Sequence, residues 1–144
     1  MAYADYRFYK EQFYGKAIAE LDFPRLASRA SSFLDYYTMG KSKKNEELHD
    51  LKMACCAIAE KYQTIDAAEK IAADALSASG EKKSEAVGSY SVSYTTGEES
   101  TKTALSIAEN ANSALAQVAQ MYLAGTGLLY RGGRNVFPPC CNCL

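Results

Sequence analysis

Histidine and cysteine are the side chains in this sequence that could carry out proton-transfer or thiol chemistry. His49 is the only histidine, and Cys55 and Cys56 follow it closely. On a helix His49 and Cys56 share a face, but seven residues at 1.5 Å each place them roughly 10 Å apart. A base and a thiol must come within about 3.2 Å to exchange a proton. We therefore expect His49 to be a solvated residue in the first turn of a helix and Cys55 to be a small core hydrophobe.

The other three cysteines, Cys140, Cys141 and Cys143, crowd the C-terminus. A structural zinc site needs four ligands, usually in two separated pairs, and this sequence offers no second pair and no second histidine. An odd cysteine count without an export signal argues against a disulfide framework. We interpret this end as a free, reducible tail, and predict no metal site and no cofactor.

The glycines between Gly125 and Gly133 are too sparse for a loop that binds phosphates, and carboxylates are scattered as solvated surface charge. Arg131 and Arg134 could contact DNA phosphates, but two arginines are a weak signal, and an acidic protein surface suits them at least as well. The sequence therefore predicts a protein that is not an enzyme. A thiol enzyme stays open as an alternative and would need a cysteine of low pKa beside a base.

Composition indicates one ordinary globular domain. The chain has 144 residues, with 16 basic and 17 acidic side chains, so no global positive field attracts nucleic acid or an anionic membrane. No stretch approaches the roughly 20 apolar residues of a membrane span. We expect a protein made in a cytoplasm, without contact with a membrane.

Helical periodicity dominates the first half of the sequence. We predict a short aromatic helix over 5–14, a second helix from a cap at Asp22 to a stop at Gly40, and a third from a cap at Asn45 to about residue 79. Glu69 interrupts the apolar stripe of the third helix and marks an expected weak point or bend.

The second half changes character before it returns to a helix. Residues 87–95 alternate Ser with Tyr or Val, which predicts a short strand or hairpin that needs a partner. A capping box at 96–99 then leads into a fourth helix over about 100–124, with Leu115 and Val118 on its apolar face and Met121 beside them. We expect Leu51, Ile58, Leu115 and Val118 to face one another in the core.

The predicted fold is thus mainly α. It is a small bundle of about four helices in residues 1–127, with a β insertion at about 86–96, followed by an extended docking tail over 128–144. The tail contains apolar and aromatic side chains and no acid after Leu129, so it is expected to dock onto a partner.

The order of these parts resembles the head–tail connector (adaptor) proteins of long-tailed bacteriophages. The resemblance covers nearly the whole chain, from the initial Met-Ala-Tyr and its aromatic helix onward. Its most specific parts are Val-Gly-Ser-Tyr-Ser-Val-Ser-Tyr at 87–94 and Leu-Ala-Gly-Thr-Gly-Leu-Leu-Tyr-Arg-Gly at 123–132. The cysteine-rich end after Pro139 departs from the family.

The resemblance implies a structural role in the virion neck, after assembly in the host cytoplasm. Such adaptors form a ring, dodecameric like the portal protein above it, which extends the DNA channel and gives a docking surface to the stopper or tail-completion protein. DNA would be only the genome passing through the lumen. The implied portal contacts are Leu128, Leu129, Tyr130, Arg131, Val136 and Phe137. The implied contacts with ring neighbours or the next neck component are Tyr90, Val92 and Tyr94. A small helical protein-interaction or regulatory module remains the alternative, which a stable monomer that binds no portal would favour.

Overall fold

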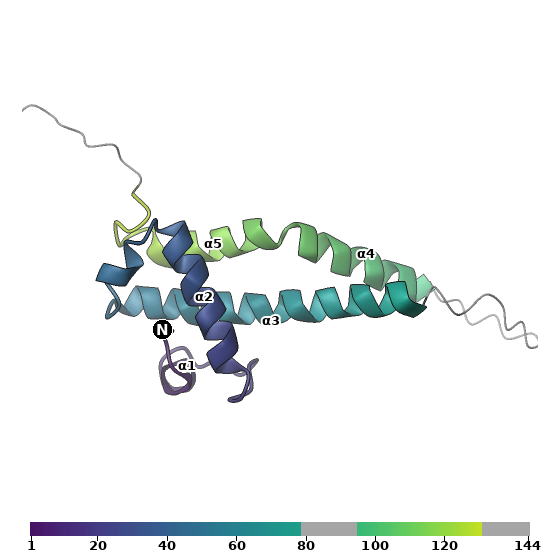
Figure 1. Cartoon of the computed structure of the whole chain (residues 1–144), viewed down its shortest axis with the longest axis horizontal. Coiled ribbons are helices and arrows are strands. Elements are labelled where there is room, and N and C mark those ends of the chain that lie inside the picture. The colour runs from purple at the N-terminus through teal and green to yellow at the C-terminus, as the bar shows by residue number, and fades with distance from the viewer. Residues whose placement is uncertain (79–94, 131–144) are drawn as a thin grey trace, which may run out of the picture.

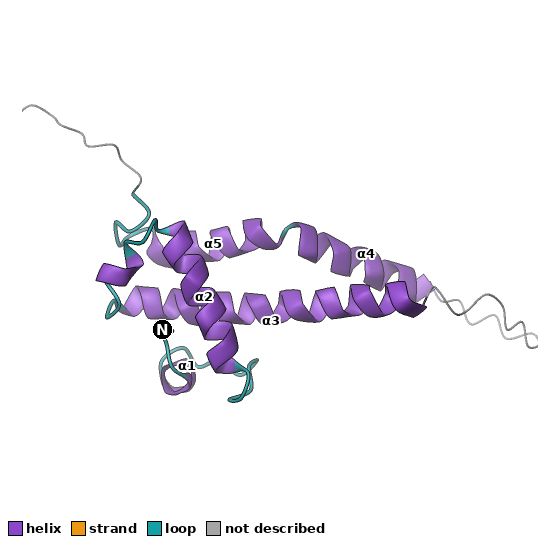
Figure 2. Ribbon diagram, viewed as in Figure 1, coloured by secondary structure: helices purple, strands orange, loops and turns teal. Residues whose placement is uncertain are grey.

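The computed structural model describes residues 1–78 and 95–130, and these ranges are mainly helical (Figures 1 and 2). The helices of the described ranges are α1 (Tyr6–Glu11), α2 (Phe23–Tyr37), the 3-10 helix η1 (Ser42–Lys44), α3 (His49–Ala78), α4 (Thr95–Glu109) and α5 (Ala111–Leu123). The predicted mainly α class is confirmed. The predicted strand at 87–94 lies outside the described residues, but Thr95 and Thr96, assigned to the β insertion, belong to α4.

Helix α3 is the central element of the molecule. Figure 1 shows α4 and α5 running back along it and α2 crossing it, with α1 on the side away from α5. Ring and ion-pair contacts join α2 to α3, because the Arg29 guanidinium lies 4.3 Å from the Tyr62 ring and 2.7 Å from a carboxylate oxygen of Asp66. Helix α3 runs unbroken through Glu69, where a weak point or bend was predicted. Glu69 is exposed while Ala68 faces α4, so the buried stripe passes beside the charge.

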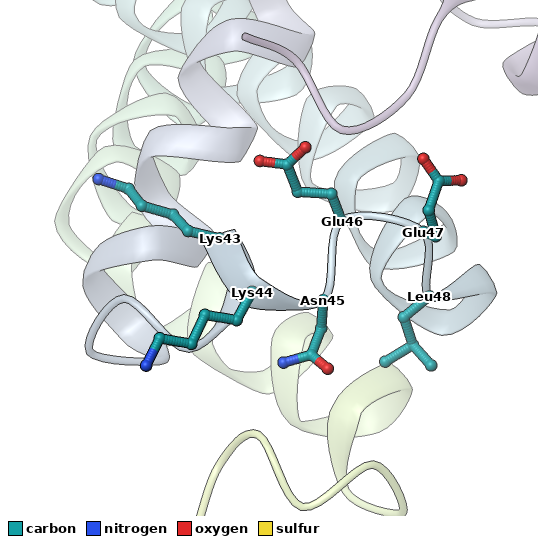
Figure 3. Close-up of a pocket in the computed structure, with 6 residues that line it drawn as sticks. All are labelled: Lys43, Lys44, Asn45, Glu46, Glu47 and Leu48. Atoms are coloured by element: carbon teal, nitrogen blue, oxygen red, sulfur yellow. The ribbon is translucent and has the colours of Figure 1, made fainter.

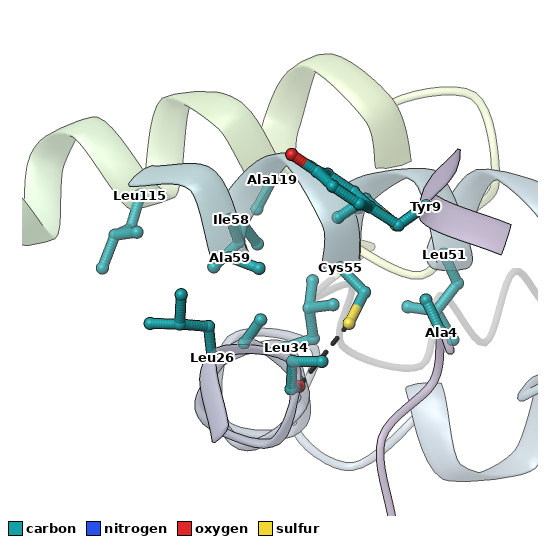
Figure 4. Packing of buried hydrophobic residues seen from close by; sticks show 14 of the residues in the cluster. Ala4, Tyr9, Leu26, Leu34, Leu51, Cys55, Ile58, Ala59, Leu115 and Ala119 are labelled. Atoms are coloured by element: carbon teal, nitrogen blue, oxygen red, sulfur yellow. Dashed lines mark hydrogen bonds between the residues drawn. The ribbon is translucent and has the colours of Figure 1, made fainter. Parts of the chain in front are cut away.

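The main core lies where α1, α2, α3 and α5 meet (Figure 4). Leu26 and Leu34 of α2 pack with Ile58 of α3 and Leu115 of α5, and all four are almost fully buried. Leu51 is buried in the same cluster, so Leu51, Ile58 and Leu115 are confirmed as core residues. Val118 is only half-buried against this cluster and also lines a surface cavity. Met121 is a correction, because its side chain is 74% exposed; Ala119 and Leu123 face the core instead.

Two predicted helix starts are wrong. Asn45 does not cap α3, because its side chain donates to Lys41 O (2.9 Å) and its N–H closes η1 by bonding Ser42 O (2.9 Å). Because of this turn, α3 begins only at His49. The predicted capping box at 96–99 lies inside α4, where Gly97 costs the helix only about 1 kcal/mol.

Asn110 divides the predicted fourth helix into α4 and α5. The Asn110 side chain donates to Ser106 O (2.8 Å), and its backbone N–H reaches the same carbonyl (3.1 Å). Asparagine side chains compete in this way with regular helical bonding. The break lets α4 follow the far half of α3 through Ala104, while α5 presents Leu115 to the main core.

The α1 segment is shorter than predicted and is followed by a structured loop. Asp5 caps it by accepting from the Phe8 N–H (2.7 Å), and the helix ends at Glu11 instead of residue 14. Tyr14, the last residue of the predicted helix, has a positive φ of 58° and is 78% exposed. Gly15 stands against the ring of Tyr9, which leaves no room for a Cβ.

Candidate partner-binding surfaces

The described side chains suited to proton-transfer or thiol chemistry differ in their exposure to solvent. His49 is exposed at the start of α3, with its ring 5.5 Å from that of Phe8. Cys55 and Cys56 are fully buried, and Cys55 Sγ lies 3.5 Å from Ser31 Oγ. Burial raises the pKa of both thiols, which opposes formation of a thiolate. The predictions of a solvated His49 and a core Cys55 are confirmed.

No metal cage is visible in the part of the chain that the structure describes. Within residues 1–78 and 95–130, no three His, Cys, Asp or Glu side chains are grouped closely enough to hold an ion. Cys140, Cys141 and Cys143 lie outside those ranges. So do Tyr90, Val92, Tyr94, Arg131, Val136 and Phe137.

The C-terminal tail leaves the bundle at the end where α2 stops and α3 starts. Leu128 is buried in the main core and Leu129 packs against it half-buried, whereas Tyr130 is 59% exposed. The Lys41 ammonium donates to the carbonyl of Tyr130. Of the predicted portal contacts, Leu128 is therefore held by its own chain, and the described part of the tail available to a partner begins at Leu129 and Tyr130.

A turn built on Thr126 and Gly127 directs Leu128 into the core. Thr126 Oγ1 donates to Leu123 O (2.8 Å) and accepts from the Leu128 N–H (3.2 Å), while Gly127 adopts a φ of 76°. A left-handed conformation of this kind favours glycine. The sequence predicted the helix stop here but missed that Leu128 belongs to the bundle, since an isolated leucine after two glycines has no periodicity to place it.

Beside the tail exit, the loop Lys43–Leu48 lines an open surface cavity of about 550 Å³. Figure 3 shows the Lys43 and Lys44 side chains extending to one side of the loop, apart from the Glu46 and Glu47 carboxylates. An open surface lined by charges of both signs lacks the enclosed, mostly apolar lining that is typical of small-ligand sites.

A polar network fixes this end of the bundle. Asp35 accepts from the hydroxyls of Tyr3 and Ser42 (2.6 Å for Ser42), and Ser42 N donates to Thr38 Oγ1 (3.2 Å). Burial, reinforced by the bond to Asp35, raises the pKa of Tyr3 to about 12, so its hydroxyl remains a donor. The N-terminal segment, α2 and η1 are thereby held in one arrangement around the tail exit.

A second surface is the groove between α3 and the α4–α5 pair, which we call the α3–α5 groove. It consists of two cavities of about 430 and 280 Å³ that share Lys61 and Thr64. The larger is floored by Ile65 and Ile107 at the Asn110 break. The smaller is bounded by residues that include Phe13, Val118 and Met121. This groove was not predicted from the sequence, because the helical spacing places Met121 with the other apolar residues of its stripe.

Comparison with models of protein families, with characterised proteins and with solved structures finds no match for this chain. Among the described helices, none combines the length and the apolar character that crossing a membrane requires.

Proposed function

We propose that this protein is a head–tail connector (adaptor) of a long-tailed bacteriophage. It acts as a structural subunit of the virion neck and assembles in the host cytoplasm. Copies form a ring, dodecameric by analogy with the portal protein, that extends the DNA channel and provides the docking surface for the stopper or tail. The observation that carries the proposal is the segment 123–132, whose sequence is the most specific part of the resemblance.

The position of that segment supports a docking role. Leu123 and Leu128 anchor it in the bundle, and the exposed Tyr130 is held by Lys41, close to the exposed loop Lys43–Leu48. The following sequence supplies Arg131, which suits pairing with an acid on the portal. Each tail needs to bind only weakly, because a ring presents many tails at once and gains avidity.

Truncation after Tyr130 tests this proposal. It removes the tail beyond the described residues while keeping Leu128, so circular dichroism should report an unchanged helical bundle. Addition of the truncated chain to heads that carry the portal protein of the same genome should give no attachment, and particles made with it should be filled heads without tails.

Truncation after Gly127 is the matched control for folding. It also removes the buried Leu128 and should lower the free energy of unfolding by about 2 kcal/mol. Normal attachment of the chain that ends at Tyr130 would show that the tail is not the anchor. Failure of the full-length chain to bind any portal, as a stable monomer, would overturn the proposed function and favour a helical interaction module.

A further inference from the structure

We propose that the α3–α5 groove receives the α1–α2 loop of a second copy of this chain, with Leu21 as the inserted side chain. The inference rests on the proposed ring and names the two surfaces by which neighbouring subunits would meet. It concerns a contact between copies and is separate from the contact of the tail with the portal.

The α1–α2 loop presents an unusual apolar tip. Leu21 is 94% exposed, although it is flanked in the chain by the buried residues Ile18 and Phe23. Tyr9 Oη accepts from the N–H groups of Ala17 (3.0 Å) and Ile18 (3.1 Å), which ties the loop to the core. A large apolar side chain on a loop that is already fixed loses little entropy when it binds.

The α3–α5 groove has the size and lining to accept such a tip. Its smaller cavity is bounded by Val118, half-buried, and Met121, 74% exposed, so apolar surface remains open to solvent. A volume of about 280 Å³ exceeds that of one leucine side chain and leaves room for the flanking backbone. Covering this surface would remove apolar area from water at both partners.

Charge selects the second copy as the occupant. Glu20 and Asp22 flank Leu21 and are exposed, and the Asp22 side chain makes no capping bond to α2. Lys61, which lines both cavities of the groove, is exposed and forms no ion pair among the described residues. Glu60 lines only the smaller cavity, and its carboxylate accepts from the hydroxyl of Tyr9 (2.7 Å). Insertion of Leu21 would bring two acids toward this lysine, and complementary charges fix the register of such contacts.

Phe13, at the start of the α1–α2 loop, bounds the smaller cavity, whereas Leu21, at the tip of the loop, lines neither cavity of the groove. Tyr9 Oη donates to Glu60 on one side (2.7 Å), and Arg25 at the start of α2 pairs with Asp66 on another (3.0 Å), so the loop spans the arc between them. Successive residues of α3 are rotated by about 100° around the helix axis. Lys61 and Thr64 therefore lie on the part of the α3 circumference that the loop does not cover. A contact between two different surfaces of identical subunits is heterologous, and heterologous contacts generate rings when the rotation closes.

A photo-crosslinking experiment on the full chain tests the contact. The photoreactive residue p-benzoylphenylalanine replaces the exposed Thr64 in a chain of normal isotopes. This chain is mixed with an isotopically heavy wild-type chain in the presence of heads that carry the portal protein, on which the proposed ring forms. After irradiation, mass spectrometry identifies the attached peptide. We expect a heavy peptide that contains Leu21, because it comes from another copy.

Two heavy variants provide the matched comparison. Leu21→Asp should reduce the crosslink by about tenfold, the loss expected when a central apolar anchor is replaced by a charge. Tyr36→Asp alters an equally prominent side chain, 82% exposed near the end of α2, and should leave the yield unchanged. Equal yields from the two variants would overturn the proposal.

The identity of the crosslinked peptide separates the remaining occupants. A peptide from 131–144 would place the C-terminal tail in the groove, and the absence of any heavy peptide would exclude a second copy; either result overturns the proposal. A charge exchange adds a second test. Lys61→Glu in the photoreactive chain should lower the yield of the crosslink, and Glu20→Lys combined with Asp22→Lys in the heavy chain should restore that yield. Portal binding is measured separately, so loss of the crosslink with intact portal attachment would reject this contact and leave the proposed function standing.

Discussion

Tyr9 shows how one side chain organises the N-terminal part of the molecule. It is fully buried, its ring centroid lies 4.9 Å from that of Phe23, and its hydroxyl donates to Glu60 (2.7 Å). Burial and the Glu60 carboxylate raise the pKa of Tyr9 to about 12, so the hydroxyl stays protonated over the physiological range. The polar atom of a core residue thus fastens α1 and the following loop to α3.

Replacement of Gly15 should reveal this dependence. In Gly15→Ala the added Cβ would overlap the Tyr9 ring, which is held on its other side by the core, so we expect a loss of about 1–3 kcal/mol in the free energy of unfolding. Urea denaturation measures it. Gly125→Ala is the control, because a Cβ there meets no atom within 4 Å. Equal stability of the two variants would mean that the Tyr9 ring is free to move aside.

A second prediction concerns the main core. Leu115 is 2% exposed between α2 and α3, and Leu115→Ala should cost about 2–5 kcal/mol because it leaves a cavity. Leu105, 45% exposed on α4, provides the same substitution outside the core and should cost much less. Thermal unfolding compares the two; an unmoved midpoint for Leu115→Ala would show that the stripe is not core.

The charged contact between α2 and α3 predicts a dependence on pH. Burial alone would raise the pKa of Asp66, but bonds to Arg29 and Arg25 outweigh it and hold the pKa below its ordinary value. Because the folded-state pKa is lowered, the stabilisation is present above the unfolded value of about 3.9 and is lost as pH falls through the folded value. Asp66→Asn should cost about 1 kcal/mol at neutral pH, since the arginines are largely solvated, and the deficit should narrow below about pH 4. Urea denaturation of the wild type and the variant at neutral pH and below about pH 4 measures this difference in the free energy of unfolding. A difference that does not change with pH would contradict the prediction.

At the scale of elements, the end of α2 is set by an unusual left-handed residue. Thr38 caps the helix, Met39 adopts a φ of 56°, and the N–H groups of Met39 and Gly40 return to Tyr36 O (3.2 Å) and Asp35 O (2.8 Å). This is the Schellman arrangement, in which the left-handed position normally belongs to glycine. Here methionine occupies it, one residue before the glycine that the sequence predicted as the stop.

Met39→Gly should therefore stabilise the protein. Removing the side chain relieves the left-handed strain, and after the extra entropy of the unfolded chain we expect a gain of about 0.5–1 kcal/mol. Differential scanning calorimetry should show a higher midpoint. Ser32→Gly, at an exposed position within α2, should instead lose about 0.5 kcal/mol. A loss for Met39→Gly would indicate that the 72% exposed methionine makes a contact that matters to folding.

At the scale of the whole molecule, the described chain has a thick end and a thin arm. The main core occupies the end where α1, α2 and α5 surround α3, whereas the far half of α3 meets only α4 (Figure 1), through the small residues Ala68, Ala72 and Ala104. Small side chains let the two backbones approach closely but bury little apolar area. The described end of the tail and the α3–α5 groove keep Tyr130 and Met121 exposed to solvent, so the bundle can fold before either surface binds a partner.

The free protein should accordingly be a monomer or a small oligomer. Each contact between copies is narrow, and association costs several kcal/mol before any gain appears, so a complete ring needs the portal as a template. Light scattering of the purified chain tests this. A robust ring at micromolar concentration without the portal would show that the template is unnecessary; Leu21→Asp would then tell whether the groove contact holds that ring together.

Local patterning determined much of this protein. Helical periodicity located α2 and α3 and the core positions Leu51, Ile58 and Leu115, because burial on one side of a helix imposes that spacing wherever it occurs. The resemblance to connector proteins also came from the sequence and remains a proposal. Tertiary structure alone decided the break at Asn110, the late start of α3, the burial of Leu128 and the exposure of Met121. Each of these features depends on which other helix lies close in space. The spacing of residues along the sequence does not determine the distance between helices. The α3–α5 groove and the Leu21 loop belong to the same group, since a surface left open can be recognised only after the helices that could have covered it are placed elsewhere.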